Sequence, residues 1–319
     1  MRYNLRHLTQ YSYPQPVANS YNLACLTPRQ LAYQQVEQTQ IDVEPTPSEV
    51  QQRTDYFGNT QHFIHLQSPH LQLAVTANSI VRVQRRDNIL KIQDGASLAQ
   101  LQQHLASQRD TATLQARLCN NASRLIPLLP EARALMTPLL GDNQNILQLA
   151  QTINQLIFKE FQYDPEFSTV VTPLSEVIRH KRGVCQDFAQ LAIACMRSIG
   201  VPARYVSGYL ETRPPEGQPR LVGADASHAW FAVFDPVLGW VDFDPTNNLL
   251  ADEQHLTVAF GRDYADVVPL KGLLQGSGEH TLTVAVDVAP LYYPNHPPLE
   301  LEINSIVNLA LLMIGSDTI

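Results

Sequence analysis

The chain has 319 residues and a mass of 35.7 kDa, about twice the size of a typical domain, so one large or two medium domains are expected. Hydrophobic residues make up 44% of the chain and charged residues 16%, which is typical of a globular protein and unlike collagen, coiled coils or disordered chains. The net charge of −8 offers little attraction to phosphate backbones or anionic membranes, so nucleic acid is not an expected partner.

The cysteine pattern argues against zinc and against a disulfide framework, because no Cys-x-x-Cys pair occurs and the four cysteines are widely spaced. We therefore expect no metal, no cofactor and a reducing, cytoplasmic location. The first residues lack the apolar core of a signal peptide. The longest apolar run near the C-terminus, residues 307–314, is far shorter than the roughly 20 residues that span a bilayer, so no membrane span is expected.

The first 85 residues carry strand signals. Apolar and aromatic residues alternate over residues 3–13, 36–43, 61–66 and 71–83, and Asp55-Tyr56-Phe57-Gly58-Asn59 is typical of a turn between strands. We predict a β-rich N-terminal domain over residues 1–85. The polar, glutamine-rich residues 86–120 are predicted to be a linker or a helical connection.

Helical periodicity begins near residue 121. Apolar residues recur at three and four positions between Ile146 and Ile157, which predicts a helix ending near Phe161. Thr172 and Pro173 are typical of an N-cap followed by proline at the first helical position, and predict a short helix to about Lys181. A third helix is expected from Cys185 until Gly200 and Pro202 stop it.

Strand signals return after this helix. Residues 203–210, 227–234 and 240–243 are predicted strands, a Pro/Gly-rich loop occupies residues 213–220, and an alternating strand at residues 282–288 is expected to close their sheet. The predicted fold class is α+β, in which the helix starting at Cys185 packs on an antiparallel sheet. Residues 121–290 form this predicted core, and residues 291–319 form a tail to which no role is assigned.

Cys185 is the candidate nucleophile. A thiol reacts as its thiolate, which a helix N-terminus or an adjacent imidazole favours. The helix predicted to begin at Cys185 directs unsatisfied amide N–H groups toward the sulfur, and the Cys185 amide is a candidate donor to an oxyanion. An isolated cysteine is more often a small buried hydrophobe, and Cys195 is expected to be one. Asp187 is expected to complement the helix N-terminus.

His228, in Ser227-His228-Ala229-Trp230, is the candidate base, because an imidazole can accept the thiol proton and return it to a leaving amine. A single strand histidine is more often only a hydrogen-bonded residue. A carboxylate at the end of the next strand could fix the imidazole tautomer, and Asp242 and Asp244 are both candidates. Period-two alternation puts the two on one face, so spacing does not choose between them, and an Asp-Pro turn is the structural alternative.

A cysteine at a helix start, followed by histidine and aspartate on successive strands, is the order of a Cys-His-Asp constellation. The chain resembles the bacterial transglutaminase-like proteins, a branch of the papain-like cysteine protease and transglutaminase superfamily. The matching motifs are Gly183-Val184-Cys185-Gln186-Asp187-Phe188-Ala189, Ser227-His228-Ala229-Trp230 and the segment from Gly239-Trp240 through Asp244-Pro245-Thr246-Asn247. In the N-terminal region, His7-Leu8-Thr9-Gln10-Tyr11-Ser12-Tyr13, Leu26-Thr27-Pro28-Arg29 and Asp55-Tyr56-Phe57-Gly58-Asn59 are similar to the β domain of this branch.

The resemblance implies a role for each matching residue. Cys185 becomes the nucleophile, His228 the general base and acid, and Asp244 of the Asp-Pro-Thr motif the orienting carboxylate, with Asp242 in reserve. Relatives also use a side chain upstream of the cysteine in the oxyanion hole, and Tyr163 is the candidate here, with core packing as its alternative.

The implied chemistry is acyl transfer from an amide of a peptide or protein substrate through a thioester. Water as the second nucleophile would make the protein a cysteine protease or amidase, which is the favoured hypothesis, and a lysine amine would make it a transglutaminase. The third hypothesis is a noncatalytic peptide-binding module. No Asp-x-Asp-x-Asp-Gly calcium loop is present, so calcium activation is not expected.

Overall fold

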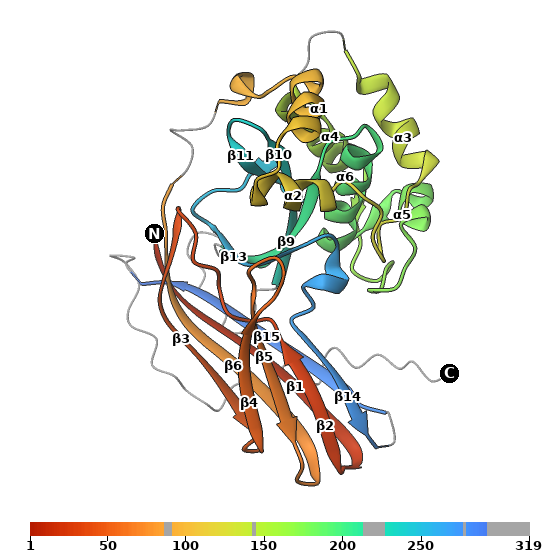
Figure 1. Ribbon diagram of the computed structural model, residues 1–319. Helices are drawn as coiled ribbons and strands as arrows, with labels where there is room; N and C mark the ends of the chain where they lie inside the picture. The colour runs from red at the N-terminus through yellow and green to blue at the C-terminus, as the bar shows by residue number, and fades with distance from the viewer. Residues whose placement is uncertain (86–90, 142–144, 213–226, 277–278, 292–319) are drawn as a thin grey trace, which may run out of the picture.

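The computed structural model describes residues 1–85, 91–141, 145–212, 227–276 and 279–291. Figure 1 shows two parts, a β-sheet region that begins at the N-terminus and a region in which helices pack on a further sheet. Together they confirm the predicted α+β class with a β-rich N-terminal region.

Two four-stranded antiparallel sheets form the first part. One sheet has the order β15 (Thr281–Pro290), β1 (Arg2–Val17), β6 (His70–Val83) and β3 (Gln34–Glu44), and the other has the order β14 (Leu270–Gln275), β2 (Asn19–Ala24), β5 (Thr60–Leu66) and β4 (Glu49–Thr54). Alternate side chains turn inward, so that Leu73 and Val75 of one sheet share a core with Ala24 and Leu66 of the other. The turn predicted at Asp55–Asn59 joins β4 to β5.

The prediction that residues 282–288 close the sheet formed by residues 203–210, 227–234 and 240–243 is wrong. β15 pairs antiparallel with β1, with Leu5 opposite Val288, and β14 pairs with β2. The alternation of Leu282, Val284, Val286 and Val288 correctly indicated a half-buried strand, but alternation fixes only which side chains turn inward and not which strand is the neighbour. The division of the chain into domains stays a prediction, and apart from Leu291 the tail lies outside the described residues.

Six α-helices occur in the described residues: α1 (Leu98–Ser107), α2 (Thr111–Leu118), α3 (Pro130–Met136), α4 (Ile146–Glu160), α5 (Leu174–His180) and α6 (Cys185–Ser198). The polar stretch 86–120 thus contains two helices, one capped by Ser97 and the other by Asp110. α4 has the predicted bounds to within one residue. α5 begins one residue later than predicted, with Pro173 in the N-cap position, while the Thr172 hydroxyl bonds the Thr169 amide instead.

A five-stranded antiparallel sheet carries the helices. Its order is β12 (Leu249–Leu250), β11 (Gly239–Asp244), β10 (Ser227–Asp235), β9 (Ala203–Leu210) and β13 (His255–Gly261). Phe231 and Val233 of β10 share a core with Leu191 of α6, while Trp230 and Ala232 pack in a second cluster on the other face. The predicted loop at 213–220 lies outside the described residues.

The N-terminal part covers the edge strand β13. The side-chain nitrogen of Asn59 donates to the backbone carbonyl of Phe260 at 2.7 Å, and the side-chain oxygen of Asn59 accepts from the backbone amide of Phe260 at 2.8 Å. Gln34 repeats this two-way pairing with Thr257, at 2.7 and 2.8 Å. Because an unpaired strand edge exposes backbone donors and acceptors, these two side chains take the place of a sixth strand and fix β13 against the first part of the chain.

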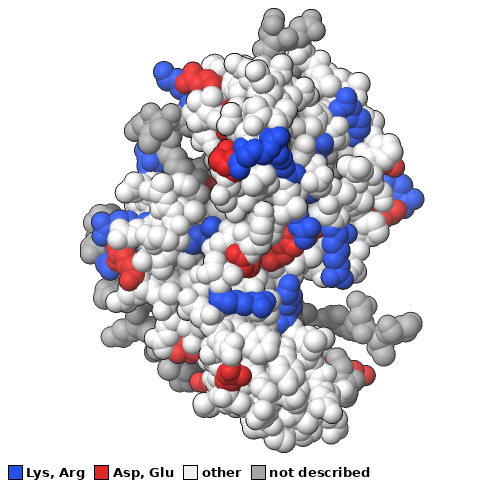
Figure 2. All heavy atoms as spheres, in the orientation of Figure 1, with Lys and Arg blue, Asp and Glu red and all other residues white. Residues whose placement is uncertain are grey.

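The surface carries both signs of charge. On the face drawn in Figure 2, Lys and Arg side chains lie beside Asp and Glu side chains among many uncharged residues. Ion pairs at the surface include Arg182 with Asp164 and Lys181 with Glu160. Within the described residues, no helix has the length and apolar character needed to cross a membrane.

Candidate active site

Cys185 is the first residue of α6, so the free amides of the first helical turn lie at its position. The preceding residues form β8 (Arg182–Gly183), which pairs in parallel with β7 (Gln162–Tyr163). A Cβ on Gly183 would lie 2.8 Å from the Asp187 carboxylate. Glycine is therefore needed at this position for the backbone to pass close to the start of the helix.

Asp187 has the structural role expected of it. Its Oδ2 accepts from the Val184 amide at 2.9 Å and from the Ser168 hydroxyl, which satisfies one free donor at the helix start. Burial raises the pKa of Asp187, although both hydrogen bonds act in the opposite direction. The segment before α5 is tied to the start of α6 through this carboxylate.

His228 and Asp244 come together across neighbouring strands. β10 and β11 run antiparallel with Phe231 opposite Phe243, which brings the start of β10 beside the end of β11. His228 Nε2 lies 2.8 Å from Asp244 Oδ2, with side chains 10% and 0% exposed. The Cys185 side chain lies close enough to His228 to act on the pKa of its imidazole. The ring is therefore bonded to the carboxylate, and the thiol lies in its surroundings.

The electrostatics favour a protonated His228. Burial alone lowers the pKa of its imidazole, but the hydrogen bond to Asp244 and the interaction with the nearby Cys185 outweigh burial and raise that pKa to about 10. Burial likewise opposes ionisation of Asp244, yet its hydrogen bonds with His228 and His255 bring the pKa of this carboxyl well below its ordinary value. Each group thus stabilises the charged form of the other.

The structure separates the two aspartates that spacing left equivalent. Asp242 Oδ2 lies 3.4 Å from the Tyr33 hydroxyl, and its charge acts on the buried guanidinium of Arg204. Asp244 is the aspartate in contact with His228. Asp244 also ends the strand in a turn, because its Oδ1 accepts from the backbone amides of Thr246 and Asn247. The Asp-Pro turn and the contact with His228 therefore occur together.

Tyr163 lies near Cys185 and is 52% exposed. Its ring makes an edge contact with Phe188, with the ring centroids 6.4 Å apart. Partial burial, and then the nearby Cys185, raise the pKa of its hydroxyl, so the hydroxyl is a hydrogen-bond donor at neutral pH. Its exposure does not match the alternative of packing in the core.

Cys185 differs from the other three cysteines. All four are free thiols, but Cys25, Cys119 and Cys195 are buried while Cys185 is partly exposed. Burial raises the pKa of Cys25 and of Cys195 to about 12, which keeps these two as thiols. As expected, Cys195 packs in the core beneath the sheet.

Two residues near the carboxylate were missed by the sequence analysis. His255 of β13 places Nε2 3.1 Å from Asp244 Oδ2, and the Asn247 amide donates to the same oxygen at 2.7 Å. Asn247 is the last residue of the Asp244-Pro245-Thr246-Asn247 motif, so the sequence offered a signal for its place beside Asp244. His255 lies outside every motif quoted, and its side chain reaches Asp244 across β9 and β10.

One nitrogen from each of the two histidines and one oxygen of Asp244 lie within 4.8 Å of one another, close enough to be considered as metal ligands. However, each Nε2 is at hydrogen-bond distance from the same oxygen, 2.8 and 3.1 Å. Such an arrangement is the one made when two rings donate to one carboxylate. Hydrogen bonding alone thus accounts for the geometry.

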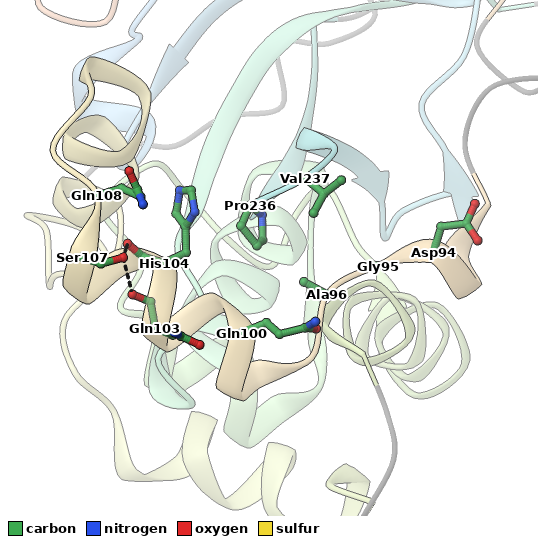
Figure 3. Close-up of a pocket in the computed structure, with 10 residues that line it drawn as sticks. All are labelled: Asp94, Gly95, Ala96, Gln100, Gln103, His104, Ser107, Gln108, Pro236 and Val237. Carbon is green, nitrogen blue, oxygen red and sulfur yellow. Dashed lines mark hydrogen bonds between the residues drawn. The ribbon is translucent and has the colours of Figure 1, made fainter.

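A separate hollow lies at the far end of β10. Its volume is about 440 Å³, and Figure 3 shows Gln100, Gln103 and His104 of α1 facing the turn at Pro236 and Val237. His228 is the second residue of β10 and Asp235 is the last, a separation of roughly 23 Å at 3.3 Å per residue. This hollow is therefore distinct from the Cys185 site.

Two family models match parts of this chain. A family model described as the bacterial transglutaminase-like N-terminal region matches residues 3–82, and one for the transglutaminase-like superfamily matches residues 133–245. An uncharacterized protein of Mycobacterium tuberculosis is 34% identical over 294 residues, covering 91% of this chain and 93% of that protein. The chain belongs to the transglutaminase-like superfamily. The second match spans Cys185, His228 and Asp244.

Two further similarities concern the fold and a part of the sequence. The crystal structure of a candidate cysteine protease from Cytophaga hutchinsonii superposes with a TM-score of 0.72 at 19% identity, over 93% of both chains. This likeness shows that the two chains share a fold. A protein-glutamine gamma-glutamyltransferase of Pseudomonas aeruginosa is 28% identical over 156 residues, which are 45% of this chain and 23% of that protein.

Proposed function

We propose that this protein is a cysteine enzyme that acts on amide bonds of peptides or proteins through a thioester acyl-enzyme. Cys185 is the nucleophile, His228 the general base and acid, and Asp244 the orienting carboxylate. The observation that carries the proposal is the His228 ring, which is bonded to Asp244 at 2.8 Å and whose pKa is raised by Asp244 and by the nearby Cys185.

In the proposed mechanism, His228 holds the proton of the Cys185 thiol, and the thiolate attacks the amide carbonyl carbon. The oxyanion accepts hydrogen bonds from the Cys185 backbone amide and, in this proposal, from the Tyr163 hydroxyl. His228 then protonates the leaving nitrogen as the C–N bond breaks, which leaves a thioester and frees ammonia or an amine. A second nucleophile gives its proton to His228 and releases the acyl group from sulfur.

We propose water as that second nucleophile, which makes the reaction hydrolytic. Cys185 is partly exposed, and crosslinking requires that water be kept from the thioester. The gamma-glutamyltransferase among the relatives supports the second candidate, amine incorporation. A noncatalytic peptide-binding role is the third. Four free thiols fit a reducing compartment, so we propose a cytoplasmic location.

Native alkylation tests the central pair. Iodoacetamide labelling from pH 5 to 9, mapped by mass spectrometry, should modify Cys185 selectively and rapidly near pH 6, because an adjacent imidazolium supports the thiolate. His228→Ala should slow that labelling about tenfold or more, whereas Cys195→Ser, a change at a buried thiol, should leave it unchanged. Labelling of Cys185 at the rate of an ordinary thiol in the folded parent would favour the noncatalytic role.

Product analysis then separates the reactions. Glutamine-containing peptides are incubated with and without a lysine-like amine. Ammonia release with a glutamate product indicates an amidase, a new peptide N-terminus indicates a protease, and amine incorporation indicates a transferase. Replacing His228 should lower whichever rate is found by roughly 10²- to 10⁴-fold, the usual contribution of general acid–base catalysis.

A further inference from the structure

His255 is a buried histidine whose two ring nitrogens both have partners. Its residue is 1% exposed, and its ring makes an edge contact with Trp230, at 5.2 Å between centroids. Nε2 lies 3.1 Å from Asp244 Oδ2, and Nδ1 lies 3.2 Å from the backbone amide of Asp252. The ring therefore bridges the carboxylate and the turn before β13.

These contacts determine where the His255 proton lies. A backbone N–H can only donate, so Nδ1 must be the acceptor of the Asp252 bond and carries no proton. The ring is then neutral with its proton on Nε2, from which it donates to Asp244. His255 thus supplies a directed hydrogen bond without adding a charge to the site.

Asp244 is held from several sides as a result. Its Oδ2 faces Nε2 of His228, Nε2 of His255 and the Asn247 amide, while Oδ1 accepts two backbone amides. A buried carboxylate with these donors keeps its charge and its orientation. With Nε2 of His228 bonded to Asp244, Nδ1 is the ring nitrogen that remains for Cys185.

We propose that His255 is a positioning residue that fixes Asp244, and through it His228, for reaction at Cys185. The inference rests on the proposed function for its catalytic meaning. The groups that face His228 are Cys185 of α6, Asp244 of β11, Asn247 and the His255 ring, whose centroid is 6.2 Å away. Of these, His255 alone comes from β13, the strand that Gln34 and Asn59 hold in place.

The test compares two changes at His255 with a control on the same strand. His255→Leu removes the donor, and His255→Gln retains an N–H donor. Thr257→Val is the control, because Thr257 is equally buried and its hydroxyl has no hydrogen-bond partner. The readout is the rate of Cys185 alkylation by iodoacetamide as a function of pH, in samples whose folding is checked by near-ultraviolet circular dichroism.

We expect the midpoint of the alkylation profile to move at least one pH unit to higher pH in His255→Leu, with about a tenfold slower reaction at pH 6. A less well-oriented Asp244 supports the His228 imidazolium less, so the thiolate forms only at higher pH. His255→Gln should restore the rate to within about threefold of the parent, and Thr257→Val should leave it unchanged. A folded His255→Leu protein with the parent's profile would overturn the proposal.

A measurement on the parent keeps the test decisive if His255→Leu does not fold. In protein labelled with ¹⁵N-histidine, and with the His255 signals assigned by their loss in His255→Gln, Nδ1 should have the shift of an unprotonated nitrogen and Nε2 that of a protonated one from pH 6 to 8. The opposite tautomer or a charged ring would overturn the proposal, as would stoichiometric Zn²⁺ binding that His255→Gln abolishes. Ordinary alkylation of Cys185 in the parent, with the expected tautomer, would instead reject the proposed enzyme activity.

Discussion

Gly208 of β9 lies opposite His228 of β10, and the Trp230 ring occupies the space beside it. A Cβ on Gly208 would be 2.6 Å from Cη2 of Trp230 and 2.1 Å from the Leu256 carbonyl oxygen. Both distances are too short for real contacts, and one involves backbone, which cannot simply rotate away. The absence of a side chain at Gly208 therefore lets β9, β13 and Trp230 come together next to the candidate site.

Gly208→Ala should consequently lower the free energy of unfolding by about 3 kcal/mol, at the upper end of the cost of overpacking a core. It should also slow Cys185 alkylation, because His228 and His255 both contact Trp230. Urea unfolding and labelling at pH 6 measure the two effects. Gly276→Ala is the control, since its nearest neighbour would be at 3.2 Å; equal stability of the two variants would contradict the tight approach at Gly208.

The pairing of Asn59 with β13 gives a second prediction. Asn59→Leu keeps a buried side chain of similar size but leaves the amide and the carbonyl of Phe260 without their partners. We expect a loss of about 3 kcal/mol in the free energy of unfolding, since each unsatisfied buried polar group costs roughly 1–3 kcal/mol. Urea denaturation measures this loss. Gln40→Leu, at an exposed glutamine, is the control and should change the free energy of unfolding by less than about 0.5 kcal/mol. An equally small effect of Asn59→Leu would show that β13 needs no side-chain partner at Phe260.

The sequence predicted those features that depend on nearby residues. The period of apolar residues located α4, and the motifs around Cys185 and His228 located the start of α6 and the start of β10. These signals are local, because a helical face or a half-buried strand leaves its mark within ten to fifteen residues. The motif Asp244-Pro245-Thr246 likewise drew attention to the aspartate that contacts His228.

The features that were missed depend on distant residues. Alternation in residues 282–288 could not show that β1 is the neighbouring strand, because any half-buried strand alternates. Asp242 and Asp244 share a pattern, and only tertiary structure places Arg204 beside one and His228 beside the other. His255 reaches Asp244 from three strands along the sheet, so no short spacing relates the two.

Asp187 offers a test of how the start of α6 is held. Asp187→Ala removes the acceptor of the Val184 amide and the Ser168 hydroxyl, and should cost about 1–2 kcal/mol, as other helix caps do. It should also slow Cys185 alkylation, because the first turn of α6 loses its anchor. Urea unfolding and labelling at pH 6 measure both.

Asp187→Asn is the matched variant. An amide oxygen in the position of Oδ2 can accept both hydrogen bonds, and burial already raises the pKa of the Asp187 carboxyl, so the negative charge is not what the site favours. We expect stability close to that of the parent and alkylation at least as fast, since one negative charge near the sulfur is removed. Alkylation as slow in Asp187→Asn as in Asp187→Ala would show that the charge itself is needed.

His7 predicts how the protein responds to acid. It is buried between the Tyr209 hydroxyl, 2.8 Å from Nδ1, and the Thr9 hydroxyl, 2.9 Å from Nε2, and burial lowers its pKa to about 4. Because the ordinary pKa of histidine is about 6.5, the unfolded chain binds a proton that the folded chain does not between these two values. The sign is therefore a loss of stability as the pH falls from 6.5 to 4, and no effect above 6.5.

On acidification from pH 7 to pH 4.5, His7 should account for a loss of about 2.5 kcal/mol in the free energy of unfolding. His7→Gln, which keeps a hydrogen-bonding side chain that does not titrate, should reduce the acid-induced loss by about that amount. His180→Gln, at an exposed histidine, should leave the loss as it is in the parent. Urea unfolding at the two pH values measures this loss. If His7→Gln is as sensitive to acid as the parent, another buried group carries the pH dependence. Protonation then does not act at the contact between His7 of β1 and Tyr209 of β9.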